Sequence, residues 1–156
     1  MSDTDPLPSV TPYLVVRHAA EAIAFYKQAF DAKELFVMTL PGTEAILHAQ
    51  LAIGNSQIML AEEMPDMNPM SRSPKSLGGS PVTIHLYCDN VDKTFEQAVA
   101  AGATVTMELM DAFWGDRYGR LEDPFGHHWS LAQPIEDVAH EEMAKRALEL
   151  FGGEGS

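Results

Sequence analysis

The stretch Gly54–Ala61, which reads Gly-Asn-Ser-Gln-Ile-Met-Leu-Ala, recurs loosely as Phe125–Ala132, Phe-Gly-His-His-Trp-Ser-Leu-Ala. A second pair of similar segments, Ala29–Lys33 and Ala100–Thr104, lies at the same spacing, since 125−54 and 100−29 both equal 71. Two repeats at one offset indicate a duplicated module. Two similar sheets that close around a cavity make a binding site for a small molecule.

Around these repeats, apolar spacing and turn residues predict the same order of elements twice. We expect strands at 11–16, 34–40, 45–53 and 56–62 with a helix at 19–30, strands at 81–88, 104–109, 117–122 and 128–133 with a helix at 91–101, and a last helix at 135–151. The chain divides into a flexible arm (1–10), a first βαβββ module (11–62), a linker (63–80), a second βαβββ module (81–133) and a C-terminal helix with a tail (134–156). The predicted fold class is α+β, with the two modules forming a concave mixed sheet.

Composition limits the partners and the location. The 10 basic and 23 acidic residues give a net charge of −13, which argues against nucleic acid and anionic membranes as partners. A single cysteine excludes an intrachain disulfide, no apolar run approaches the roughly 20 residues of a membrane span, and the acidic first ten residues do not resemble a signal peptide. We therefore expect a cytoplasmic protein.

Strand alternation predicts which side chains line the cavity, because successive residues of a strand point to opposite faces of the sheet. Val82, Ile84 and Leu86 share an apolar face with Cys88, which we expect in the core, whereas His85 is on the polar face. An antiparallel sheet with one solvated face would alternate in the same way, but the duplication favours a cavity between two sheets. The residues expected on the cavity face include Tyr13, His48, Gln57, Met59, His85, Arg120, Glu122 and His128.

Three features together resemble the vicinal oxygen chelate superfamily, which includes glyoxalase I, extradiol dioxygenases, and the bleomycin and fosfomycin resistance proteins. They are the paired βαβββ modules, the segment Ala24-Phe25-Tyr26, and the turn Asp123-Pro124-Phe125-Gly126-His127. The longer stretch Phe113–His127 resembles the PhnB-like, glyoxalase-related subgroup, and the likeness covers about residues 10–134. It implies the superfamily fold and a homodimer, because sheets in this superfamily commonly pair across subunits.

The resemblance also implies the positions of four ligands to one divalent metal. These positions fall on Thr11, Met59, Thr83 and Ser130. Hydroxyl and thioether groups are poor ligands for a cation that prefers imidazole or carboxylate, so we expect no metal or other cofactor there. A two-residue slip of the alignment gives Tyr13 and His85, which restores only one ligand.

Other residues of the cavity face offer alternative chemistry. A displaced metal site would use His48, His85, Glu122 and His128, because three protein ligands suffice for a catalytic metal. The same imidazoles would equally form hydrogen bonds with a ligand or with each other. Glu122 beside Arg120 is either a general base with an electrostatic partner or a salt bridge of the cavity wall. His127, in the turn, is expected to be structural or exposed.

Two loops are also notable. Phe113, Trp114 and Tyr118 surround a Gly-containing loop, where they form either the mouth of a pocket or part of a dimer interface. Three methionines of the linker, Met64, Met67 and Met70, suit either a lid or a disordered loop.

The function predicted first is binding of a small, apolar or aromatic molecule in a sheet-lined cavity without the usual metal. The residues expected to bind this ligand are Tyr13, His48, Gln57, Met59, Trp114, Tyr118, Arg120 and His128. The alternative is a divalent-metal-dependent lyase, isomerase or dioxygenase that uses the displaced ligands. A third possibility is a metal-free acid–base enzyme with Glu122 and His85 as catalytic residues.

Overall fold

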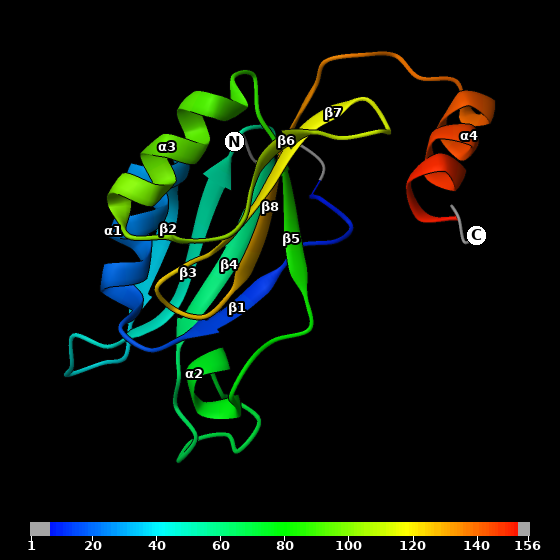
Figure 1. Ribbon diagram of the computed structural model, residues 1–156. Coiled ribbons are helices and arrows are strands. Elements are labelled where there is room, and N and C mark those ends of the chain that lie inside the picture. Colours follow the sequence, from blue (N-terminus) through cyan, green and yellow to red (C-terminus); the bar gives the residue numbers. More distant parts are fainter. Residues whose placement is uncertain (1–6, 153–156) are drawn as a thin grey trace.

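The computed structural model describes residues 7–152, so residues 1–6 of the expected arm and residues 153–156 of the expected tail lie outside it. It contains the two βαβββ modules in the predicted order, joined by a short helix and followed by a C-terminal helix (Figure 1). The elements are β1 (Tyr13–Val16), α1 (Ala19–Phe30), β2 (Lys33–Thr39), β3 (Ile46–Ile53), β4 (Ser56–Glu62), α2 (Pro74–Leu77), β5 (Thr83–Tyr87), α3 (Val91–Ala101), β6 (Thr104–Asp111), β7 (Asp116–Glu122), β8 (His128–Pro134) and α4 (His140–Phe151).

The two modules form two sheets of four strands with equivalent strand orders. The first sheet runs β1-β4-β3-β2 and the second β5-β8-β7-β6. In each sheet the first strand pairs in parallel with the last strand of its module, and the other pairs are antiparallel. The parallel pair requires a crossover, which the helix and the two intervening strands provide. The sheets are therefore mixed, as the α+β prediction states.

One hydrophobic core spans both modules. Helices α1 and α3 contact each other and lie on the same side of the molecule (Figure 1). Beneath them, strand residues such as Leu51, Leu60 and Leu131 are fully buried. Burial of these apolar side chains is the main force that holds the modules together. Each sheet consequently has one face under the helices and one open face.

The Asp123–His127 turn is organised around a buried carboxylate. Asp123, only 2 % exposed, accepts hydrogen bonds from the Tyr26 hydroxyl (2.5 Å) and from Trp129 Nε1 (2.9 Å). Its other oxygen accepts from the backbone N–H groups of Phe125 (2.9 Å) and His127 (3.0 Å). Burial, together with the neighbouring Asp123 charge, raises the pKa of Tyr26 well above its ordinary value. The motif thus joins α1 of one module to β8 of the other.

His127 has a structural position, one of the two expected for it. Its Nε2 lies 3.0 Å from the backbone carbonyl oxygen of Val15 in β1. This contact links the turn of the second module to the first strand of the first module.

The segment at 63–80 is more ordered than a linker with a disordered loop would be. Glu63 accepts from the backbone N–H of Ser73 at 2.6 Å and pairs with Arg17 at 3.3 Å. The buried Ser73 in turn caps α2, and a Cβ at Gly126 would lie 2.8 Å from Pro74, so α2 packs tightly on the Asp123–His127 turn. Hydrogen bonds and packing therefore hold the expected linker at Glu63 and at Ser73–Pro74.

Helix α4 begins five residues later than predicted and stands away from the body of the chain (Figure 1). The backbone N–H groups of Ile135 and Glu136 both bond the Gly115 carbonyl (2.9 and 3.0 Å), which keeps this stretch out of the helix. None of the α4 residues is fully buried, and Leu148 and Phe151 are 68 % and 73 % exposed. None of the helices within residues 7–152 has the length and apolar character that a membrane crossing requires.

Candidate functional site

The open face of the second sheet carries most of the predicted site residues, and strand register arranges them in rows. The central row is His85, Ser130, Arg120 and Met107, one residue from each strand. On one side lies a row of Thr83, His128, Glu122 and Thr104, and on the other a row of Tyr87, Ala132, Tyr118 and Met110. Neighbouring strands are about 4.8 Å apart, so each row is a short line of adjacent side chains. The small, buried Ser130 and Ala132 lie in the middle of two of these rows, between the larger side chains of the neighbouring strands.

His85 is held in place by a hydroxyl and by aromatic rings. Its Nδ1 lies 2.6 Å from Ser130 Oγ. Its ring is stacked with Tyr118 at 6.1 Å between centroids and meets Tyr87 edge-on at 4.7 Å. If the Ser130 hydroxyl donates to Nδ1, the proton of a neutral His85 is on Nε2, which is then available to a ligand.

An aromatic series continues from His85 toward the C-terminal helix. Trp114 meets Tyr118 edge-on at 5.2 Å and donates from Nε1 to Asp116 Oδ2 at 2.9 Å. Phe113 contacts Trp114 at 5.1 Å, and Phe151 of α4 at 5.9 Å. The loop thus lies between the second sheet and α4, and its use as a pocket mouth or as an interface stays a prediction.

Arg120 and Glu122 have different partners from those predicted. Arg120 Nη2 donates to Thr83 Oγ1 at 2.5 Å, and the contact recorded for Glu122 is with His128 Nδ1 at 3.9 Å. The predicted ion pair between Arg120 and Glu122 is therefore wrong. Residues two apart on a strand share a face, but the long Arg120 side chain reaches across β8 to β5.

The open face of the first sheet holds the other predicted residues. Its central row, Tyr13, Met59, Gln50 and Phe36, corresponds to the central row of the second sheet. The Tyr13 hydroxyl lies 2.6 Å from His48 Nδ1, and His48 Nε2 lies 3.4 Å from Gln50 Oε1. Partial burial raises the pKa of Tyr13 above its ordinary value.

The expectation of one cavity that holds His48, His85 and Glu122 together is wrong for the single chain. His48 lies on the first sheet, and His85 lies on the second. Glu122 and His128 line a separate pocket of about 380 Å³ beside Lys75 and Gly78. Alternation along a strand identifies the face on which each side chain lies, but not how the two sheets are placed relative to each other. The sequence therefore could not show that these three side chains lie apart.

The largest of the described hollows is a groove of about 610 Å³ along the edge strand β5. His85 and Tyr87 line it from β5, and Gln57 and Asn55 line it from the β3–β4 hairpin. This volume falls in the range of small-molecule sites. The groove therefore brings His85 and Gln57, both predicted site residues, to one place formed by both modules.

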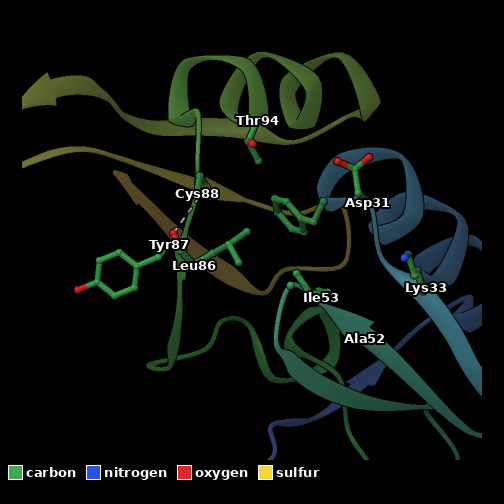
Figure 2. Close-up of a pocket in the computed structure, with 10 residues that line it drawn as sticks. Asp31, Lys33, Ala52, Ile53, Leu86, Tyr87, Cys88 and Thr94 are labelled. Atoms are coloured by element: carbon green, nitrogen blue, oxygen red, sulfur yellow. Dashed lines mark hydrogen bonds between the residues drawn. The ribbon is translucent and has the colours of Figure 1, made fainter. Parts of the chain in front are cut away.

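A second pocket of about 330 Å³ lies on the seam between the modules, next to the groove (Figure 2). Asp31 and Lys33 approach it from the first module, and Cys88 and Thr94 from the second, whereas the Tyr87 ring points away. The Cys88 side chain packs partly against the core, as predicted. Burial raises the pKa of this thiol, so Cys88 is not an activated nucleophile.

The residues at the superfamily's metal positions do not fit a divalent metal. Ser130 Oγ is bonded to His85, and Thr83 Oγ1 accepts from the Arg120 guanidinium. A fixed cation within hydrogen-bond distance of a ligand position opposes binding of a second cation. Within residues 7–152, no three His, Cys, Asp or Glu side chains are grouped to hold a metal ion.

This fold, with two equivalent mixed sheets and helices on one side, is that of the vicinal oxygen chelate class. The chain belongs to the Glyoxalase/Bleomycin resistance protein/Dioxygenase superfamily, whose family model matches residues 7–131. The match ends before α4.

Similar proteins support the assignment to this superfamily. An uncharacterised protein of Mycobacterium tuberculosis (strain ATCC 25618 / H37Rv) is 50 % identical over 138 residues, which cover 87 % of this chain and 80 % of that protein. The structure of a gene product of Arabidopsis thaliana is 28 % identical with a TM-score of 0.64, covering 81 % of this chain and 99 % of that one. The PhnB protein of Bacillus cereus, 18 % identical with a TM-score of 0.62 over 81 % of this chain and 99 % of that one, shares the fold.

Two features of the site were not predicted from the sequence. The bond between His85 and Ser130 depends on parallel pairing of β5 with β8. The bond between Arg120 and Thr83 depends on the same register. The residues of each pair are far apart in the sequence, so the sequence gives no sign of either contact. The repeat offset, which aligns Ser130 with Met59, indicated only the row in which Ser130 lies.

Proposed function

We propose that this superfamily member binds a small, apolar or aromatic molecule on the open face of the second sheet, without the divalent metal of its metal-dependent relatives. The observation that supports this most strongly is the His85–Ser130 pair, with the rings of Tyr87 and Tyr118 against His85. His85 and Tyr87 also line the large groove. A mostly apolar wall with a few fixed polar groups is typical of ligand sites. The composition further favours a cytoplasmic location.

The test is native mass spectrometry with elemental analysis of protein purified without chelator, followed by a titration with any small molecule that co-purifies. We expect no stoichiometric metal, and we expect His85→Ala to weaken binding of the retained molecule about tenfold. A suitable matched control is His18→Asn, because His18 is exposed before α1 and Asn tolerates its positive φ of 65°. Stoichiometric Zn, Ni, Fe or Mn that is lost in His85→Ala would support the metal-dependent enzyme instead.

We also propose that the protein is a homodimer. The open faces expose large apolar side chains, among them Tyr13 (52 %), Phe36 (48 %) and Tyr87 (65 %). Exposed apolar surface of this kind marks interaction sites. A second copy would cover these faces and bring His48 of the first sheet near a second-sheet site. Light scattering tests this proposal, and a mass equal to that of one 17.1 kDa chain would refute it.

Helix α4 is proposed as part of the same interface. A 12-residue helix is marginal in water unless its apolar side is packed, and α4 is connected to its own chain mainly through Arg146 and Phe151. Removal of residues 139–156 should shift the dimer toward monomer without changing the folded core. If the truncated protein is still a dimer at low micromolar concentration, α4 is not part of the interface.

A further inference from the structure

Arg120 differs from three other arginines because it is bonded to a hydroxyl and not to a carboxylate. The only bond recorded for its guanidinium within residues 7–152 goes to Thr83 Oγ1, and no ion pair of this part of the chain includes it. Arg17, Arg117 and Arg146 each bind a carboxylate at 3.3 Å or less. A guanidinium has five N–H donors, so Arg120 has several left for a ligand.

Within the described part of the chain Arg72 also lacks a carboxylate partner, but it is exposed, so the burial and the composition around Arg120 are what make its case informative. Acidic residues outnumber basic ones by 23 to 10, so carboxylates are plentiful. Arg120 is nevertheless half-buried on the sheet, and nearby Glu122 contacts His128 instead. Removing a cation from water without a counter-ion costs free energy. An anionic ligand would offset that cost.

The neighbours of Arg120 define the rest of the ligand. Along its row come Ser130 and then His85, at two strand spacings, or roughly 10 Å. The adjacent row provides Tyr118, whose ring contacts both His85 and Trp114. An anion-binding group at one end of an aromatic surface fits a planar molecule with an acidic substituent.

We propose that the ligand of the second sheet is an aromatic molecule with one acidic group, whose carboxylate, sulfonate or phosphonate binds Arg120 while its ring lies beside Tyr118 and Trp114. This inference rests on the proposed function, because it specifies the ligand of the same face. Planar, bidentate recognition of such acids is the property that separates Arg from Lys.

The test uses two fluorescent probes, 8-anilinonaphthalene-1-sulfonate and N-phenyl-1-naphthylamine, which share a ring system and differ by the sulfonate. We expect the full-length protein to bind the sulfonate more tightly, despite its net charge of −13. Arg120→Gln should weaken binding of the sulfonate at least tenfold, the scale of a hydrogen bond to a charged group. Its effect on the neutral probe should be less than twofold.

Two further variants complete the design. Arg72→Gln removes the same charge from the segment before α2, where Arg72 bonds the Pro69 carbonyl, and should leave both affinities unchanged. Arg120→Lys keeps the charge but loses the planar, bidentate guanidinium. It should weaken binding of the sulfonate probe, and its circular dichroism spectrum should match that of the wild type. If both probes bind equally and Arg120→Gln affects neither selectively, the inference is wrong and the binding function stands. If neither probe binds the wild-type protein, the inference and the proposed function are both wrong.

Discussion

At the scale of single residues, Asp123 supports more of the fold than any other polar side chain of the turn. Its two oxygens accept four hydrogen bonds, from Tyr26, Trp129 and two backbone N–H groups. An amide in its place would direct N–H donors at groups that are themselves donors. We expect Asp123→Asn to lower the free energy of unfolding by about 3 kcal/mol, since a buried charged acceptor is lost. Urea denaturation measures this.

The control for that variant is Asp137→Asn, at an exposed position before α4. It should stay within about 0.5 kcal/mol of the wild type, as is usual for surface substitutions. Equal effects of the two substitutions would mean that the buried network does not stabilise the fold.

We expect substitution of one tryptophan to affect stability and substitution of the other to affect ligand binding. Trp129 is 1 % exposed, so Trp129→Ala should cost about 3–5 kcal/mol through lost burial and the cavity left behind. Trp114 lies in the β6–β7 loop beside Tyr118, so its loss should spare the core and weaken binding of the aromatic probe. Thermal melts and titrations on both variants provide the comparison. If Trp114→Ala unfolds the protein while Trp129→Ala is tolerated, the loop is structural and does not bind the ligand.

The hydrogen bonds of Glu63 predict how the stability of the fold changes with pH. The hydrogen bond from the Ser73 backbone N–H, with others from Ser76 and Arg17, lowers its pKa from 4.5 to about 2. The ionised form therefore stabilises the fold fully above pH 4.5, and this contribution disappears as the pH falls toward 2. Glu63→Gln should be less stable than the wild type at pH 7, with a difference that shrinks below pH 4.5. A difference independent of pH, measured by urea melts, would contradict the assignment.

At the scale of elements, the sequence predicts most of the fold correctly. The bounds of β4 and α3 agree with the predicted ranges, and Ile84 and Leu86 pack on the core while His85 is on the open face. These features depend on local spacing alone. The late start of α4 depends on hydrogen bonds from 135–136 to Gly115, a long-range contact that periodicity does not contain.

The docking of α2 on the Asp123–His127 turn gives a prediction for two glycines. Gly126 has a φ of +91°, and an added Cβ would lie 2.8 Å from Pro74. Gly42 has a φ of +81° but open space around it, so Gly42→Ala isolates the backbone strain. We expect Gly126→Ala to cost about 1–3 kcal/mol more than Gly42→Ala. Equal losses in chemical denaturation would mean that α2 does not pack on the turn.

At the scale of the whole molecule, duplication explains the two equivalent sheets, but the arrangement of the candidate site lies beyond sequence reasoning. Alternation predicted that His48 and His85 line one cavity, but they lie on different sheets of the chain. The contacts of His85 with Ser130 and of Arg120 with Thr83 arise only once β5 pairs with β8. The site is therefore a property of sheet register as much as of residue type.

The most direct test of ligand binding on the second sheet is a two-dimensional NMR titration that follows the imidazole resonances of the six histidines. The probe is 8-anilinonaphthalene-1-sulfonate, added to protein free of added metal. We expect saturable shifts of His85, with no change at His18, which lies next to the start of α1. Shifts confined to His18 or His140, or a His85 resonance that responds to Zn²⁺ and not to the probe, would contradict this expectation.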